Sequence, residues 1–587
     1  MLWLRALWTQ IWVTLVVAAV ALALYISLGR QLIPLVETYR ADLEQQLSAA
    51  LGQPVYIGQL KGGWNRLSPN VEIRDIQFGP AGDGISVRSV QAELDVSASL
   101  FYRLPVFQHI IINGVASEVH HLGGPDWRIG SQWALDLAAH KPAEQPAQPD
   151  KSRSSAGRDE QPLWLRWLQL QKSIELTDWQ LVAFDPDQTR EVLNVERLAL
   201  RNQGPNHEFD SHIEWGREQV ASIRAMASMQ GDLWPWNKQH GEVYLDVQSQ
   251  EWSRFIPDNL PSGLKVDNFS AGAEAWLTVS DGDLSSLYLN ADIPQLTIAT
   301  KAEPIALSNG TLRVAGKHNG EDWHLQVRPH FDQTLPFNDF SLSSIALKAS
   351  TGLIYKGWQV GIPQADIAEA TDFLSRHSLL PAPFDRYISN INARGQASAV
   401  HLSAIPGTPW KMDVKANLHE VSTDAYSGIP AFEDISGKVQ LQPHGGRLDV
   451  DSEDFRMLLS GIYDNAWDLK QAHGSFFWSV EPDYARLQVN GLNGYLSGTE
   501  DDPGIWPVAV ELGLTLPRIG SNKESAINLM VGMPKAEASL RHQLVPALLN
   551  DGIRSWIDDS VTDGHFTDAA FVMRRPLHDE HIANTDS

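Results

Sequence analysis

The 587-residue sequence contains no cysteine, which excludes disulfide bonds, thiolate metal sites and thiol chemistry. Positive charge is scarce as well, because 46 Lys and Arg stand against 71 Asp and Glu and give a formal net charge of -25. Nucleic-acid binding calls for a basic surface, so we expect no nucleic-acid partner. The length allows roughly four ordinary domains, or fewer units if the body is an elongated repeat.

Catalytic motifs are missing too, since the sequence has no glycine-rich phosphate loop, no G-x-S-x-G elbow and no H-E-x-x-H zinc helix. His207 and Glu208 form only half of a zinc motif. The adjacent His120 and His121 would point to opposite faces of a strand, so we interpret them as solvated or capping histidines.

One acidic stretch is compatible with calcium. Asp449, Asp451 and Glu453 alternate and would share one face of a strand. The solvated face of a strand explains the same residues equally well. We therefore expect no metal site, no cofactor and no catalytic residues, and a hydrolase has no motif to support it.

Long hydrophobic runs are limited to a single stretch, residues 11–28, which carries no charge. At 1.5 Å per residue it would reach about 27 Å as a helix, which predicts a transmembrane anchor with residues 1–10 in the cytoplasm. A cleaved signal peptide is the alternative, although the run continues past its small-residue sites. Arg5 on one side competes with Arg30 on the other, so charge alone barely decides the orientation.

The rest of the chain divides by its periodicity. Residues 29–52 have apolar positions at helical spacing and predict a membrane-proximal helix, which Pro34 should kink. From residue 53 the period changes to two, so 53–139 predicts a first β-groove segment. Residues 140–161 lack aromatic and large aliphatic side chains and predict a disordered loop. The segment 162–587 predicts a repeating β body.

Alternation in this body predicts antiparallel strands with one apolar and one wet face. Trp323, Leu325 and Val327, for example, alternate with His324 and Gln326. The residues that we predict to line the apolar side are Leu245, Val247, Leu312, Val314, Leu325, Val327, Val414, Leu418, Val439, Leu441, Leu448 and Val450.

An internal repeat is superimposed on the alternation. Three nine-residue segments are echoed in the same order at offsets of 123, 125 and 127 residues. A helical stretch precedes each copy, around 251–260 and around 366–380. We predict two repeat-like units, about 251–365 and 366–477. The paired segments start at Gly272 and Gly395, at Asn290 and Lys415, and at Ser308 and Ile435.

The apolar face needs a cover, and the sequence offers little helix to supply it. Either two sheets pack against one another, or a long curved sheet leaves an open apolar groove. An open groove in water would need an apolar occupant. Because the chain also carries a predicted membrane anchor, we expect that occupant to be lipid.

Three stretches carry a resemblance to a known family. They are LGQPVYIGQLKGGWNRLSPNVEIRDIQF from Leu51, FQHIIINGVASEVHHLGGPDWRIG from Phe107 and QLVPALLNDGIRSWIDDSVTDGHF from Gln543. These stretches resemble the AsmA-like envelope proteins, most closely the YhdP family of Gram-negative bacteria. The resemblance implies an inner-membrane, single-pass protein with the bulk of its chain in the periplasm. It also implies a β-groove that carries phospholipid acyl chains between the inner and outer membranes, without catalytic residues.

Members of that family are typically much longer than this chain. A truncated form and a second polypeptide that completes the bridge to the outer membrane therefore both stay open. The expected fold is mainly β: an elongated, twisted antiparallel repeating β-groove with short helices and an N-terminal transmembrane helix. The expected function is a non-enzymatic phospholipid conduit. The alternative is an assembly or scaffold factor that uses β-edges in outer-membrane biogenesis.

Overall fold

The structure is a computed structural model. It describes residues 2–51, 53–65, 68–79, 84–123, 126–129, 133–136, 163–184, 190–216, 221–232, 238–253, 256, 265–319, 322–332, 335–336, 340–348, 354–355, 357–379, 389–405, 411–426, 431–459, 462–499, 502–518, 521, 524–547 and 549–577. The predicted disordered loop, 140–161, lies outside the described residues.

The chain begins with three consecutive helical segments, α1 (Leu2–Leu32), η1 (Ile33–Tyr39) and α2 (Arg40–Leu51). Within α1, the stretch Gln10–Gln31 is long and apolar enough to cross a membrane. The α-helical geometry changes to a tighter 3₁₀ helix where Pro34 occurs, because proline has no amide hydrogen to donate to the preceding turn.

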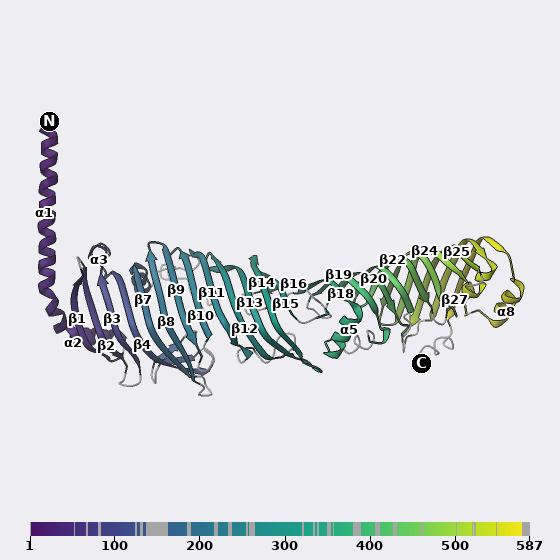
Figure 1. Cartoon of the computed structure of the whole chain (residues 1–587), viewed down its shortest axis with the longest axis horizontal. Coiled ribbons are helices and arrows are strands. Elements are labelled where there is room, and N and C mark those ends of the chain that lie inside the picture. The colour runs from purple at the N-terminus through teal and green to yellow at the C-terminus, as the bar shows by residue number, and fades with distance from the viewer. Residues whose placement is uncertain are drawn as a thin grey trace, which may run out of the picture. The chain divides into compact units, whose positions relative to one another are not determined.

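The chain divides into two compact units, and the first comprises residues 1–250 together with 271–291. Its strands and short helices follow one another in the order seen in Figure 1. They are β1 (Val55–Asn65), β2 (Ser68–Phe78), β3 (Ile85–Leu94), α3 (Val96–Tyr102), β4 (Phe107–Gly123), β5 (Asp126–Ile129), β6 (Trp133–Asp136), α4 (Leu163–Leu170), β7 (Ser173–Phe184), β8 (Arg190–Gln203), β9 (Asn206–Trp215), β10 (Ala221–Gln230) and β11 (His240–Glu251).

Neighbouring strands in unit 1 pair in the order β1–β2–β3–β4–β7–β8–β9–β10–β11. Every pair is antiparallel except β4–β7, which is parallel. The exception arises because the chain between β4 and β7 contains the β5–β6 hairpin and α4, and this long crossover returns it to the end at which β4 began.

The second unit comprises residues 251–270 and 292–587, so that β12 (Lys265–Ser280) and β13 (Asp283–Ala299) contribute to both units. The remaining elements are β14 (Ile305–Asn319), β15 (Asp322–Phe331), β16 (Ser341–Lys348), β17 (Ile354–Tyr355), β18 (Trp358–Asp366), α5 (Ile367–Arg376), β19 (Arg394–Ile405), β20 (Lys411–Thr423), β21 (Ala431–Gln442), β22 (Gly445–Leu458), β23 (Trp467–Val480), β24 (Tyr484–Thr499), β25 (Asp502–Pro517), β26 (Ser525–Glu537), η4 (Ala538–Leu540), α7 (Arg541–Leu544), α8 (Asp551–Ser560) and β27 (His565–Leu577).

Strand pairing in unit 2 is antiparallel from β14 to β27 and follows chain order, with β17 placed on β16 beside β18. The expected mainly β fold with antiparallel pairing and short helices is therefore confirmed. The sheet is not closed into a barrel: among the described strands, β1 pairs only with β2 and β27 only with β26.

The predicted repeat falls on matching elements. Its first three segments lie on β12, β13 and β14, and their echoes lie on β19, β20 and β21. The helical stretch predicted around 366–380 corresponds to α5, whose first turn Asp366 caps by accepting a hydrogen bond from the Glu369 amide. Most of the stretch predicted around 251–260 lies outside the described residues. The repeat boundaries themselves stay a prediction.

Candidate functional site

Apolar side chains in unit 1 line up across strands as well as along them. Residues directly opposite one another in paired strands point to the same face of a sheet. Following these partners from β1 to β11 gives a row in which every member is apolar, and we call it the Val247 row. Its members are Ile57, Ile76, Val87, Val115, Trp179, Val195, Ile213, Ile223 and Val247.

A second row runs beside the first and contains one polar member. Ser211 is buried, and its hydroxyl donates to the carbonyl oxygen of Ala225 over 3.4 Å. We call this the Leu245 row, and the face that carries both rows the apolar face of unit 1. The row consists of Leu60, Ile73, Val90, Ile112, Leu176, Leu198, Ser211, Ala225 and Leu245.

From β1 to β8 the two rows lie on one face only because the strands are kinked between them, whereas in β9, β10 and β11 their members are two positions apart. Ile57 and Leu60 are three positions apart, which would place them on opposite faces of a regular strand. Both are buried in the same apolar cluster. The interruption recurs in neighbouring strands, where Asp75, Gly114 and Asp178 have φ values of +55°, +69° and +56°. Each left-handed residue shifts the phase of alternation by one position and bends its strand.

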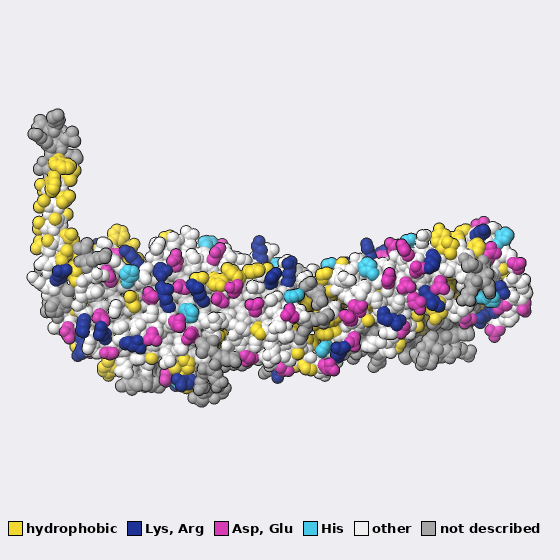
Figure 2. All heavy atoms as spheres, in the orientation of Figure 1, with side chains coloured by type: hydrophobic (Ala, Val, Ile, Leu, Met, Phe, Trp, Pro, Cys, Tyr) yellow, Lys and Arg dark blue, Asp and Glu magenta, His cyan; other side chains and the backbone are white. Residues whose placement is uncertain are grey.

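The opposite face along this kink line carries paired charges. Arg88 donates to the Asp178 carboxylate at 3.0 Å, and Arg197 contacts Glu175 at 2.7 Å and Asp210 at 3.3 Å. These side chains are partly to largely exposed, so the pairs add little stability and mainly keep this face polar. Figure 2 shows charged side chains distributed over the surface in this view.

Unit 2 carries the longest apolar row. Starting from β14 and following the directly opposed partners to β26 gives twelve residues, of which only Gly446 lacks an apolar side chain. The ring of Trp478 lies over that glycine, where a Cβ atom would come within 2.2 Å of it. We call this the Val327 row, made of Val314, Val327, Leu342, Val360, Leu402, Val414, Leu441, Gly446, Trp478, Leu487, Leu514 and Ile527.

A parallel row starts at β20 and reaches β27. We call it the Val439 row and the face that carries both rows the apolar face of unit 2. Its members are Ala416, Val439, Leu448, Phe476, Val489, Leu512, Leu529 and Met573.

Register places all twelve predicted residues on the apolar face of their unit. Leu312 and Leu325 alternate with members of the Val327 row, and Leu418 is directly opposite Gly437, which is itself opposite Val450. The degree of exposure differs among the twelve. Leu441 is 40% exposed, nine are half-buried, and Leu448 and Val450 are buried in a packed cluster. Contact of these residues with lipid stays a prediction.

The apolar face of unit 1 is covered near its first strands. Val36 of η1 and Leu43 and Leu47 of α2 pack against buried residues of β1, β2, β3 and β4. Farther along the Val247 row, Ile213, Ile223 and Val247 are half-buried. The cover therefore thins from β1 toward β11.

In unit 2 the cover changes in the opposite direction along the chain. The Val327 row is half-buried from Val314 to Leu514, apart from the 40% exposed Leu441, and only Ile527 in β26 has no exposed surface. The Val439 row beside it is buried from Leu448 to Leu529. The buried part is filled by large side chains, including stacked and edge-on contacts of Phe432 with Phe455 and Phe476 at 5.9 Å.

The filled part is closed by two segments that follow β22 and β26. Trp467 is 2% exposed, and its indole nitrogen donates to the carbonyl oxygen of Gln543 over 3.0 Å. Leu540 in η4 is fully buried, and Leu544 in α7 packs on the same cluster. The amide of Ala547 donates to the Ile462 carbonyl, so both segments are fastened to each other.

The polar residues weighed as metal ligands have structural contacts. His207 is buried, and its ring nitrogens lie 2.7 Å from the Asn202 side-chain oxygen and 3.0 Å from the Gly231 carbonyl oxygen. Burial lowers the pKa of His207 and favours its neutral form. Asp449 accepts hydrogen bonds from Arg447 and Ser475. Within the described part of the chain, no group of three or more His, Asp or Glu could hold a metal ion.

Sequence reasoning missed the kink line and the two covers. The signal for the kink is present in β2, where Val71, Ile73, Ile76 and Phe78 are spaced by two, three and two residues. A spacing of three inside an otherwise alternating strand indicates a residue that breaks the phase. The covers had no comparable signal, because they depend on contacts between segments far apart in the chain.

Comparison with known proteins gives one family and one curated relative. The sequence profile of the family described as "YhdP protein" matches residues 1–586. The protein named "Intermembrane phospholipid transporter YhdP" from Escherichia coli (strain K12) is 23% identical over 273 residues. This match covers 45% of the present chain and 19% of the relative, so it spans about a fifth of the relative's length. No solved structure matches the chain.

Proposed function

Because the chain belongs to the YhdP family, we propose that it is a non-enzymatic conduit for phospholipids in the cell envelope of a Gram-negative bacterium. In this proposal α1 crosses the inner membrane once and the remainder of the chain lies in the periplasm. Acyl chains travel along the apolar faces while headgroups stay in water. The name of the relative, an intermembrane phospholipid transporter, supports this class of cargo.

The observation that carries the proposal is the Val327 row. A conduit needs apolar residues that continue from strand to strand without a polar break, because an acyl chain crossing a polar strip would lose its favourable contacts. In the Val327 row, twelve strands in succession, from β14 to β26 without β17, meet that condition. The half-buried state of Val314, Val327 and Leu402 supports the idea that these side chains are available to an apolar ligand.

The filled end of the apolar face of unit 2 refines the proposal. The packed cluster around Phe455 and Phe476 leaves no room for an acyl chain beside Leu448. We therefore assign the lipid-facing role to the half-buried members of the predicted set and to Leu441. Leu448 and Val450 instead stabilise the end at which the groove is filled.

Photo-crosslinking in the full-length chain tests the conduit. A photoreactive amino acid replaces Val327 in one variant and Gln326 in another, its neighbour on the exposed opposite face of β15. Irradiation in native membranes, followed by mass spectrometry, should give phospholipid adducts at position 327 and far fewer at 326. Equal adduct yields at the two positions, or none at 327, would overturn the conduit.

A second candidate is the assembly or scaffold factor, and the open strand β27 favours it. Among the described strands β27 pairs only with β26, and the edge strand of an antiparallel sheet can accept a strand of another protein. Leu325→Asp distinguishes the two functions, with His324→Asp as the matched control on the other face of the same strand. A conduit should lose function in the first variant alone, whereas a scaffold should keep it in both.

The conduit proposal also includes a bridge to the outer membrane, either directly or through a second polypeptide.

A further inference from the structure

Unit 1 exposes four large apolar side chains on two short helices. Leu100, Phe101 and Tyr102 end α3 and are 76%, 79% and 44% exposed, and Trp164 at the start of α4 is 67% exposed. The rings of Phe101 and Tyr102 are in edge-on contact, with centroids 5.0 Å apart. Large apolar side chains gathered at one place on a soluble surface indicate a contact with another apolar phase.

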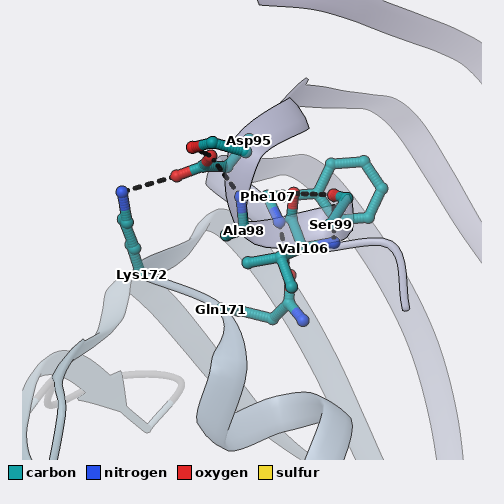
Figure 3. Close-up of polar contacts among 8 residues, drawn as sticks. Asp95, Ala98, Ser99, Val106, Phe107, Gln171 and Lys172 are labelled. Atoms are coloured by element: carbon teal, nitrogen blue, oxygen red, sulfur yellow. Dashed lines mark hydrogen bonds and ion pairs between the residues drawn. The ribbon is translucent and has the colours of Figure 1, made fainter. Parts of the chain in front are cut away.

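The helix that carries three of these residues is held in place by polar contacts. Asp95 is 4% exposed, and its carboxylate accepts hydrogen bonds from the amide of Ala98 at 3.0 Å and from Lys172 at 2.6 Å (Figure 3). The hydroxyl oxygen of Ser99 accepts a hydrogen bond from the amide of Val106 at 2.9 Å. The exposed tip is therefore a fixed part of the fold.

The second helix is tied to the same loop. Gln171, which directly follows α4, accepts a hydrogen bond from the Phe107 amide at 2.8 Å. The indole nitrogen of Trp167 donates to the Pro105 carbonyl at 3.0 Å. Since β4 begins at Phe107, both helices are fastened to the same end of β4, and their apolar tips belong to one edge of the sheet.

α1 extends past this same edge of the sheet, whereas α2, which follows it in the chain, lies at the other end of β1 (Figure 1). β1 ends at Asn65, whose side chain donates to Glu93 near the end of β3 at 3.1 Å. One residue earlier, the Trp64 ring contacts Tyr25 of α1, with centroids 5.2 Å apart. The end of β1, the end of β3 and α3 therefore lie beside α1 at a common edge, where Figure 2 shows hydrophobic side chains next to that helix.

The contact between Tyr25 and Trp64 also indicates where the surface of the bilayer lies relative to the sheet. Tyr25 lies inside the apolar stretch that ends at Gln31, and six residues of helix span about 9 Å. A bilayer crossed by α1 would thus have its surface at this edge of the sheet. Arg103 and Arg166, both exposed, flank the apolar tips, and such cations are attracted to anionic headgroups.

We propose that Leu100, Phe101, Tyr102 and Trp164 form a membrane-contacting foot, which inserts at the surface of the bilayer that α1 crosses. A single transmembrane helix leaves its attached domain free to rotate and tilt. A second contact with the bilayer, made by α3 and α4 at the edge of the sheet, restricts this rotation and tilt. It thereby sets the angle between the apolar face and the membrane. Aromatic and cationic side chains at this depth match the composition of membrane interfaces. The inference rests on α1 crossing a bilayer and is independent of lipid movement along the groove.

The absence of cysteine makes a labelling test direct. The full chain with Phe101→Cys carries an environment-sensitive fluorophore and is reconstituted into vesicles of phosphatidylethanolamine and phosphatidylglycerol that contain nitroxide-labelled lipid. The control is Tyr56→Cys, because Tyr56 is also an exposed aromatic residue but lies near the other end of β1. We expect about threefold stronger quenching at position 101 than at 56.

A second variant separates the foot from a local change in the label's surroundings. The fluorophore is placed at Trp164→Cys, with or without Leu100→Asp and Phe101→Asp. Loss of quenching at 164 in the charged background is the expected result, because the two helices would leave the bilayer together. Equal quenching at positions 101 and 56 would contradict the proposed membrane-contacting foot. Quenching at position 164 that is unchanged by the charged substitutions would contradict it as well. Neither outcome affects lipid crosslinking at position 327, so the two proposals fail separately.

Discussion

Strands β14–β20 and strands β21–β26 of unit 2 carry the same alternation of apolar and polar residues, yet their apolar faces differ in exposure. In the first region the Val327 row is half-buried, whereas in the second region the neighbouring Val439 row is buried from Leu448 to Leu529 and the Val327 row ends at the fully buried Ile527. The difference lies in what is packed against the face. The buried cluster of the second region contains three phenylalanines and is closed by Trp467 and Leu540, which are not members of either row. Alternation therefore defines which face is apolar, and additional segments decide whether it stays accessible.

The largest effect should come from introducing a charge into the closed region. Leu529 in β26 is 2% exposed, and Leu529→Asp would bury a carboxylate without a partner. We expect a loss of about 4 kcal/mol or more in the free energy of unfolding, enough to prevent folding of this region. Val327→Asp, in the accessible region, should fold and cost about 1 kcal/mol. Circular dichroism and limited proteolysis of both variants check the contrast, which fails if the two behave alike.

Removing a large side chain should give the next largest effect. Trp467→Ala leaves a cavity in the closed region and loses the hydrogen bond to Gln543, so we expect a loss of about 3–4 kcal/mol. Trp323→Ala, at a half-buried position in the accessible region, should cost about 1 kcal/mol. Denaturant titration followed by fluorescence measures both. Similar losses would mean that the accessible region is packed as tightly as the closed one.

In unit 1, the polar contacts of Asp95 beneath α3 should contribute a stability that depends on pH, whereas the apolar packing of unit 2 should contribute one that does not. Hydrogen bonds from Ala98 and Lys172 hold the pKa of Asp95 at about 2, below its ordinary value of 3.8. A depressed pKa contributes stability above the ordinary pKa that disappears as pH falls through the folded one. Asp95→Asn keeps a capping side chain but removes the charge, so we expect a loss of about 1–2 kcal/mol at pH 6 that vanishes between about pH 4 and 2. Thermal unfolding across this range checks it, and a loss independent of pH would contradict the assignment.

The smallest effect should come from the kink line. Gly114 has φ +69°, and an added Cβ atom would meet the Arg88 side chain at 2.7 Å. Gly114→Ala should therefore cost about 1 kcal/mol. Gly532 in β26 has open space around its missing Cβ atom, and Gly532→Ala should be neutral or slightly stabilising. Unfolding titrations of the two variants compare them, and equal stability would show that the kink tolerates a side chain.

Much of the fold could be predicted from local patterns. The apolar stretch of α1, the change of helix geometry at Pro34, the strands and the apolar side of each strand follow from residue type and spacing, because backbone geometry fixes which neighbours share a face. The twelve residues chosen from alternation consequently lie on the apolar faces of their units. The parallel pairing of β4 with β7 was not predictable in this way, because it depends on how a long crossover returns to the sheet.

The sequence by itself thus determined a β-rich chain with one apolar face and one N-terminal apolar helix. Only the tertiary structure decided where that face is filled, where it is half-buried, and that α3 shares an edge with α1. The physical reason is the sequence separation of the residues that are involved. Side-chain direction is a property of neighbouring residues, whereas cover depends on contacts such as Trp467 with Gln543 or Lys172 with Asp95, whose partners are 76 and 77 residues apart.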